Sequence, residues 1–140
     1  MVPRVVLLPL LAAVAFLAAR PAAADMILEL ANQSRVQVIF GVAGASSTRI
    51  VIPGETFSQG PYTETKTIEL AVAGIEAMAS GKNVLCRGTA VFTALPGTSV
   101  SNCEWVAGAG DADQPAKCAV ATSGNSTQQC RVMFHVSPTQ

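Results

Sequence analysis

The sequence predicts an all-β domain, a disulfide-stapled antiparallel β-sandwich of about eight short strands, with an immunoglobulin-like or jelly-roll-like topology left unassigned. Three observations support this class: apolar and polar residues alternate with a period of two, Gly-, Pro- and Asn-containing turns recur, and the chain has four cysteines. A period of two is typical of strands that bury one face. Turns spaced about 8 to 12 residues apart are typical of sandwiches and barrels.

The first 24 residues are predicted to be a secretory signal peptide. Arg4 gives a positive start, residues 5–19 are apolar, and residues 22–24 are alanines ahead of Asp25. The apolar run has 15 residues, which is short of the roughly 20 that a membrane-spanning helix requires. Residues 25–140 are therefore expected to be the mature chain, a single domain of 116 residues with a formal charge of −2.

The strands of this domain follow from the alternating pattern, which is clearest over 35–42 and 130–136. In the latter segment Cys130, Val132 and Phe134 fall on one face, and the intervening residues fall on the other. The Ala- and Met-rich stretch 70–80 competes as a helix, but Gly74 favours a strand that runs into a loop or a single helical turn. The expected strands are 26–31, 35–42, 48–52, 63–72, 84–93, 99–106, 118–122 and 130–136.

The cysteines are predicted to form two disulfides, because export leads to an oxidising compartment. Four cysteines allow three pairings, and the sequence alone does not choose between them. A hairpin folded about Gly124 would set Cys118 opposite Cys130. We therefore favour Cys118–Cys130 together with Cys86–Cys103, with all four side chains directed inward.

The charge balance and the scarcity of histidine argue against several functions. Nine basic and nine acidic residues leave no basic excess of the kind that nucleic-acid and anionic-membrane partners require. His135 is the only histidine, and it falls on the expected outer face of the last strand, so Ser–His and Cys–His catalysis are not expected. Two residues in one loop, Asp111 and Asp113, are too few for a calcium loop, and Met133 beside His135 is a weak copper pattern. No metal or other cofactor is predicted.

The function predicted from these observations is that of an exported, non-catalytic binding or interaction module that contacts a protein or glycan through its loops. One expected contact is the loop 107–117, which contains Asp111 and Asp113 and has Trp105 at its base. The other is the loop from Phe57 to Tyr62. The module is expected to act without a transmembrane segment, and its oligomeric state is left open.

Two alternatives remain open at the sequence level. The chain is a subunit of an assembled surface structure that uses edge-strand pairing, with 26–30 as a donor strand, or a small hydrolase that uses paired carboxylates. In addition, Asn32 and Asn125 head glycosylation tripeptides at predicted exposed turns, which matter only in a eukaryotic host.

Overall fold

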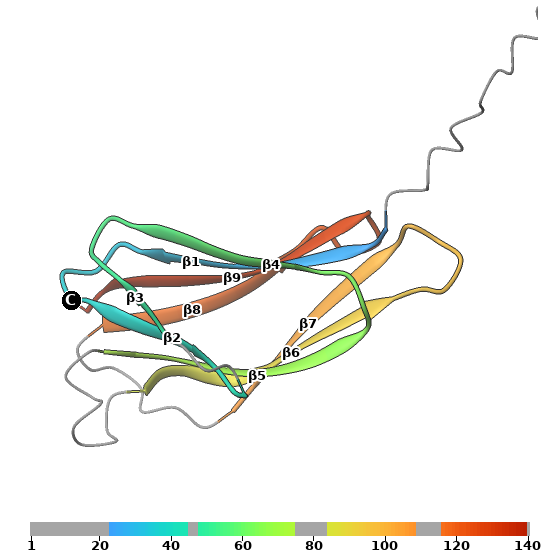
Figure 1. The fold of residues 1–140 in the computed structure, drawn as a ribbon. Helices are drawn as coiled ribbons and strands as arrows, with labels where there is room; N and C mark the ends of the chain where they lie inside the picture. The colour runs from blue at the N-terminus through green and yellow to red at the C-terminus, as the bar shows by residue number, and fades with distance from the viewer. Residues whose placement is uncertain (1–22, 45–47, 75–83, 109–115, 140) are drawn as a thin grey trace, which may run out of the picture.

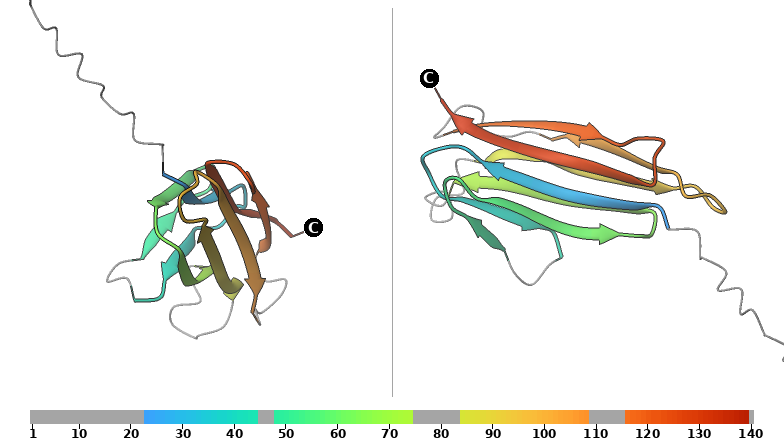
Figure 2. Two further views of the ribbon diagram at one scale, coloured as in Figure 1. Left: turned by 90° about the vertical axis from the view of Figure 1, so that its right-hand side faces the viewer. Right: turned by 90° about the horizontal axis from the view of Figure 1, so that it is seen from above.

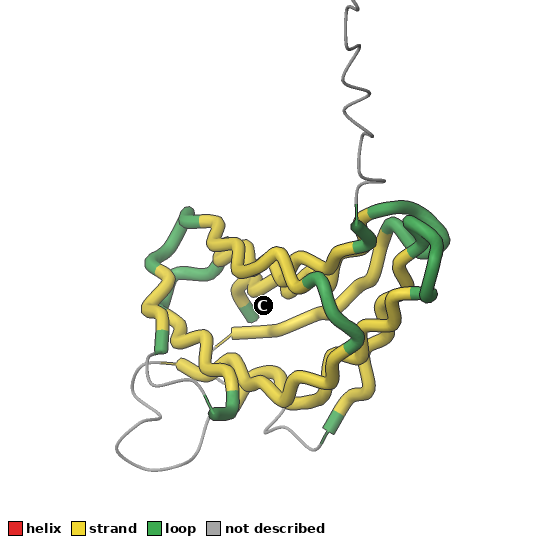
Figure 3. The backbone as a smooth tube through the Cα atoms, turned by 45° about the vertical axis from the view of Figure 1, so that its right-hand side comes forward, coloured by secondary structure: helices red, strands yellow, loops and turns green. Residues whose placement is uncertain are grey.

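The computed structural model describes residues 23–44, 48–74, 84–108 and 116–139, which form two β-sheets and confirm the predicted all-β sandwich. The predicted leader lies outside these residues except for its last two positions. Figure 3 shows the two sheets as the two layers of the molecule. The strands are β1 (Asp25–Asn32), β2 (Val38–Val42), β3 (Arg49–Val51), β4 (Thr56–Tyr62), β5 (Lys66–Gly74), β6 (Val84–Ala94), β7 (Ser101–Ala107), β8 (Ala116–Ser123) and β9 (Gln129–Pro138).

The sheets differ in size and both follow a crossed strand order. Sheet A has the order β4-β1-β9-β8, and sheet B has the order β3-β2-β5-β6-β7 (Figure 1). The first and last strands, β1 and β9, run parallel to each other in the middle of sheet A, whereas every other strand pair is antiparallel. Figure 2 (right) shows this sheet face-on, with β1 in blue beside β9 in red. The first and last strands of the domain are thus held together by backbone hydrogen bonds.

The core lies between the sheets and is built from the alternating residues that the sequence indicated. On β1, Met26, Leu28 and Leu30 are at most 1% exposed, and on β9, Val132 and Phe134 are buried equally well. Burying a side chain of this size contributes about 1.5 to 3 kcal/mol. The alternation in the central strands of sheet A is therefore the main local signal for the fold.

A chain of aromatic rings crosses this core from β7 to β4. Trp105 packs edge-on to Phe134 with the ring centroids 5.1 Å apart, Phe134 lies 5.8 Å from Phe40, and Phe40 lies 5.8 Å from Phe57. Beyond Phe57, the last ring of this series, the guanidinium of Arg49 lies 5.2 Å from the Phe57 ring centroid. Edge-to-face pairs of this kind each add about 0.5 to 1.5 kcal/mol beyond area burial.

Both disulfides join sheet A to sheet B, and the predicted pairing is wrong. Cys86 on β6 is bonded to Cys118 on β8, and Cys103 on β7 is bonded to Cys130 on β9. The expected inward direction holds for all four: Cys86, Cys103 and Cys130 are at most 8% exposed, and the half-buried Cys118 points toward sheet B, where it bonds to Cys86. The two bridges therefore clamp the sandwich between the β6–β7 side of one sheet and the β8–β9 side of the other.

The pairing differs because the β8–β9 hairpin folds about a different residue. The register pairs Cys118 with Val136 and Ser123 with Arg131, so the fold is centred on Thr127 rather than on Gly124. Cysteines of one hairpin that are not opposite each other have no bonding geometry within their own sheet. Each one instead meets a cysteine of sheet B across the core.

The corner after β1 is built on a buried asparagine, which corrects the expectation that Asn32 is an exposed acceptor for glycosylation. Asn32 is 0% exposed, and its Nδ2 donates to Val36 O at 2.8 Å and to Val51 O at 2.9 Å. Its Oδ1 accepts from the Ser34 backbone N–H at 3.1 Å and from the Ser34 hydroxyl at 2.6 Å. The nitrogen that a glycan would occupy is therefore used inside the fold.

The proposed donor strand is also part of the domain's own core. Residues 26–30 lie in β1, which pairs with β4 on one side and with β9 on the other. A strand with both neighbours in place has no free edge to offer to another chain. The expectation that 26–30 serves as a free donor strand is therefore wrong for this fold.

Candidate functional site

A hollow opens in the side of the sandwich where β2 ends. The last residue pair between β2 and β5 is Val42 with Leu70. One further hydrogen bond follows it, from Ala43 N–H to Glu69 O at 2.9 Å. β5 extends further, to Lys66, and among the described residues no strand continues on the β2 side of it there, whereas β6 pairs with it on the other side. A cavity of about 520 Å³ occupies this place between β2, β4 and β5. We call it the Tyr62 hollow; its wall includes Val42, Gln59, Tyr62, Lys66, Ile68 and Glu69.

A β-bulge in β4 sets the side chains of Gln59 and Tyr62 on the same face. The pairing with β1 shifts register between Met26, opposite Tyr62, and Leu28, opposite Gln59. Residues three apart in a regular strand point to opposite faces, but the extra residue of a bulge reverses the second one. Gln59 and Tyr62 are accordingly both half-buried, while Gly60 is exposed.

Glycine is required at the bulge. Gly60 has a φ of 121°, and a Cβ at this position would lie 2.9 Å from Met26 O. Both the dihedral angle and the close approach of β1 exclude a larger residue. The local sequence Gly60-Pro61 thus interrupts the alternation of β4 and turns Tyr62 toward the hollow. Segment 57–62 was predicted to be a loop, and this expectation is wrong, because it forms most of the edge strand β4.

The polar groups around the hollow come from two strands. Burial raises the pKa of Tyr62, and a hydrogen bond with Gln59 acts in the opposite direction. The Lys66 ammonium lies 5.7 Å from the centroid of the Tyr62 ring. At neutral pH the Tyr62 hydroxyl is therefore protonated and can both donate and accept hydrogen bonds. It lies beside the Gln59 amide and the Lys66 ammonium.

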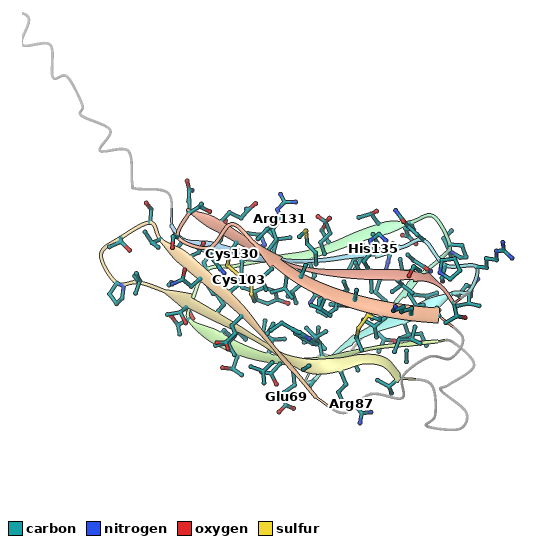
Figure 4. All side chains as sticks on the ribbon, turned by 180° about the vertical axis from the view of Figure 1, so that it is seen from behind. Glu69, Arg87, Cys103, Cys130, Arg131 and His135 are labelled. Carbon is teal, nitrogen blue, oxygen red and sulfur yellow. A yellow bond between two sulfur atoms is a disulfide. The ribbon has the colours of Figure 1, made fainter. Side chains whose placement is uncertain are left out.

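A second hollow of about 540 Å³ adjoins the first on the outer face of sheet B. Its floor is formed by residues with little or no side chain, Gly41, Ala71 and Gly88, and it shares Glu69 with the Tyr62 hollow. We call it the Arg87 hollow. Glu69 and Arg87 both project from this face of sheet B (Figure 4). Opposite charges thus stand on the exposed surface of β5 and β6.

The outer face of sheet A differs in this respect. Arg131 on β9 forms an ion pair with Glu29 on β1 at 3.1 Å and a hydrogen bond with Gln129 at 3.3 Å. Within the part of the chain that the structure describes, the side chains of Glu69 and Arg87 have no such partner. Glu29 and Arg131 on sheet A therefore pair with each other, whereas Glu69 and Arg87 on β5 and β6 of sheet B have no ionic partner among the described residues.

The other predicted site residues have different places. Phe57 and Trp105 belong to the aromatic chain of the core rather than to a contact loop, and Trp105 also lines a smaller cavity of about 350 Å³ beside the Cys86–Cys118 bridge. The expected loop 107–117 is shorter than predicted, because 107 belongs to β7 and 116–117 belong to β8. Asp111 and Asp113 lie outside the described residues, so their role stays a prediction.

Two further predictions concern exposed positions. Asn125 is exposed, and its Oδ1 accepts a hydrogen bond from the Cys103 backbone N–H at 2.7 Å. His135 is exposed on the outer face of β9, where the sequence placed it, and the neighbouring Met133 is half-buried.

The sequence did not single out Gln59, Lys66, Glu69 or Arg87. Each is an ordinary polar residue within a strand, and only the meeting of three strands brings the first three together. The one available signal was Gly60-Pro61 inside an otherwise alternating segment, since such a pair can mark a bulge.

Two features are absent from the described ranges: a cluster of metal ligands and a membrane-spanning helix. No group of three or more His, Cys, Asp or Glu side chains is arranged to hold a metal ion there. No helix in these ranges is long and apolar enough to cross a membrane. No known family model matches the chain, and no curated protein sequence matches it significantly.

Proposed function

We propose that this protein is an exported, non-catalytic interaction module, and that its contact surface consists of the Tyr62 hollow and the Arg87 hollow. Two cross-sheet disulfides are compatible with an oxidising extracellular or periplasmic environment and support the export part of the proposal. The surface replaces the loops that the sequence suggested.

The single observation that carries this proposal is the bulge that brings Tyr62 beside Gln59 at an opening in the sandwich wall. Bulges are common where a strand must re-aim a side chain toward a site. The two adjoining hollows have volumes within the range of about 300 to 1,000 Å³ that ligand pockets show. Glu69, which both hollows share, makes them one continuous surface.

A photo-crosslinking experiment tests this assignment. A photoreactive amino acid is placed at Thr67, which borders the Tyr62 hollow, or at Thr89, which borders the Arg87 hollow. Matched controls carry it at Ala119 or His135, which are exposed on the outer face of sheet A. We expect adducts in the producing cells from the first pair and not from the second. Adducts from the control positions alone would refute the proposal.

Edge-strand pairing is a second candidate, and one observation favours β8 as the edge. β8 pairs with β9 over eight residues without a register shift, and Lys117 is its single charged residue. The other edges have features that discourage pairing: β3 has three residues, β4 contains Pro61, and the start of β7 is hydrogen-bonded to Thr127. Gel filtration over a concentration series tests this candidate. A monomer at every concentration would rule it out, and dissociation by Thr122→Pro, which removes an N–H that points away from β9, would support it.

A further inference from the structure

We propose that the Tyr62 hollow binds a sugar unit of a neutral oligosaccharide. This inference rests on the proposed function, because it takes the hollow as a binding site and names the chemical class of its ligand. Three properties of the hollow support it: the donors and acceptors around it, its apolar surfaces, and the charged and polar groups in its wall.

The donors and acceptors of the hollow match a ligand that is neutral and rich in hydroxyl groups. Lys66 only donates hydrogen bonds and the Glu69 carboxylate only accepts them, whereas Gln59 and the Tyr62 hydroxyl do both. An anion would face the Glu69 carboxylate, and a cation would face the Lys66 ammonium. A sugar hydroxyl both donates and accepts, so it is compatible with every one of these groups without a charge penalty.

The backbone of β5 adds another donor and acceptor. Because the Glu69 carbonyl points toward β2 to accept from Ala43, strand alternation directs the N–H and C=O of Thr67 to the same side. β2 ends before it reaches Thr67, and among the described residues no strand takes its place on this side of β5, whereas β6 pairs with β5 on the other side. These two groups are therefore available to a ligand that enters the hollow.

The apolar part of the wall suits the C–H face of a sugar ring. Tyr62 contributes an aromatic surface with a polar end, and Val42 and Ile68 contribute aliphatic carbon. Lys66 is exposed and has a flexible stem, so its position over the Tyr62 ring can adjust to a ligand. One site thus offers both an apolar surface and several hydrogen-bonding groups.

A protein side chain fits this hollow less well. The core of a protein interface is apolar and depleted in charge, but the wall here contains Gln59, Lys66 and Glu69. The large apolar residues that are exposed in the described ranges lie elsewhere; they are Ile50, Ile52, Leu95 and Val106. The chemistry of the wall therefore favours a hydroxylated ligand over a buried apolar anchor.

Nitrogen-15 NMR of the purified exported protein tests the inference. The probes are maltotetraose, cellotetraose and the tetramer of N-acetylglucosamine, with an oligogalacturonate as an anionic comparison and a glycine peptide as a zwitterionic one. We expect a neutral probe, at up to about 10 mM, to give saturable shifts at Gln59, Tyr62 and 66–69. The anionic and zwitterionic probes are expected to leave these signals unchanged.

Variants separate a binding role from a structural one. We expect Gln59→Ala and Tyr62→Phe each to weaken the binding of the neutral probe by about threefold to tenfold, as for the loss of one hydrogen bond. Gln128→Ala changes a glutamine that is exposed outside the hollow and is expected to bind as the wild type does. Both site variants keep the core residues, and retention of the two disulfides and of the wild-type spectrum verifies their folding.

Three outcomes would overturn the inference: no shifts with any neutral probe, shifts at the hollow only with the charged probes, or equal binding by Gln59→Ala, Tyr62→Phe and Gln128→Ala. Photo-crosslinks from Thr67 and Thr89 to a protein in these cases would leave the proposed interaction surface standing. Loss of both the crosslinks and the sugar shifts would refute the surface as well.

Discussion

The indole of Trp105 meets the ring of Phe134 edge-on, with the centroids 5.1 Å apart and the ring planes at 89°. This contact joins β7 of sheet B to β9 of sheet A, the same two strands that the Cys103–Cys130 bridge connects. A covalent bond and an aromatic pair therefore hold the two sheets at fixed spacing on this side, and the bulged strand β4 lies at the other end of the aromatic chain.

The indole depends on a glycine beneath it. A Cβ at Gly88 would collide with the backbone O of Val106 and would lie 2.6 Å from Trp105 Cζ2, so Gly88→Ala is expected to displace both the β7 backbone and the ring and to destabilise the protein by about 1 to 3 kcal/mol. Urea unfolding followed by the fluorescence of Trp105, the only tryptophan, measures both effects.

Gly41→Ala is the matched control for this substitution. A Cβ at Gly41 would meet its nearest atom, Thr48 Cγ2, at an ordinary 3.5 Å. We expect its free energy of unfolding to stay within about 1 kcal/mol of the wild type. Equal losses in the two variants would contradict the close packing of the indole on β6.

The disulfide pairing leads to a chemical prediction. Peptide mapping of the unreduced protein is expected to yield Cys86 linked to Cys118 and Cys103 linked to Cys130. The bridged residues are 32 and 27 apart in the chain, so replacing either pair by alanine is expected to cost about 3 to 4 kcal/mol in the chain-entropy treatment. A peptide that contains Cys118 linked to Cys130 would contradict the structure.

The buried corner at Asn32 is expected to be sensitive to substitution. Asn32→Ala removes the side-chain donor to the Val51 carbonyl and the acceptor of the Ser34 backbone N–H, whereas the Val36 carbonyl keeps the Ser34 hydroxyl as a donor. Each buried group that loses its partner costs about 1 to 3 kcal/mol. Asn102→Ala is the control, since its Oδ1 accepts a single exposed bond from Ser126 N–H at 3.1 Å. The unfolding temperature is expected to fall much further in Asn32→Ala than in Asn102→Ala. Similar falls in the two variants would contradict a stabilising role for the buried hydrogen bonds of Asn32.

The turn between β3 and β4 gives a pH-dependent contribution to stability. The Ile52 backbone N–H, which donates to the Glu55 carboxylate at 3.0 Å, and the Arg49 guanidinium at 2.9 Å lower the pKa of Glu55 below 4.5. A lowered folded-state pKa gives stability that is present above the ordinary value and is lost as the pH falls through the folded-state pKa.

Glu55→Gln tests this contribution. The variant is expected to be less stable than the wild type at neutral pH, and the difference is expected to shrink as the pH falls below about 4.5. Urea unfolding midpoints of both proteins at neutral and acidic pH measure it. A difference that stays constant with pH would show that the carboxylate charge has no role in the turn.

Much of the fold was predictable because it depends on local patterning. The alternation in β1 and β9, the turns between strands, and the presence of cysteines at inward positions were all readable, since one buried face imposes a period of two. Two disulfides were expected, but which cysteines bond to each other depended on the register of the β8–β9 hairpin. A shift of the fold centre from Gly124 to Thr127 was enough to change both bonds.

The candidate site was much less predictable. Tyr62 was singled out from the sequence for its residue type, but in a supposed loop; its neighbours Gln59, Lys66 and Glu69 were not singled out at all. A polar residue on a strand has the same local pattern whether it faces open solvent or a hollow. The difference arises from where a neighbouring strand ends.

The sequence by itself determined the class of this protein: a disulfide-containing, weakly charged sandwich with a predicted export leader, because burial periodicity and composition act locally along the chain. The tertiary structure alone decided which cysteines meet, that Asn32 is buried, and that β4 bends at Gly60 to place Tyr62 beside Gln59. These features depend on strand register and on the end of β2, which are set by contacts between residues far apart in the chain.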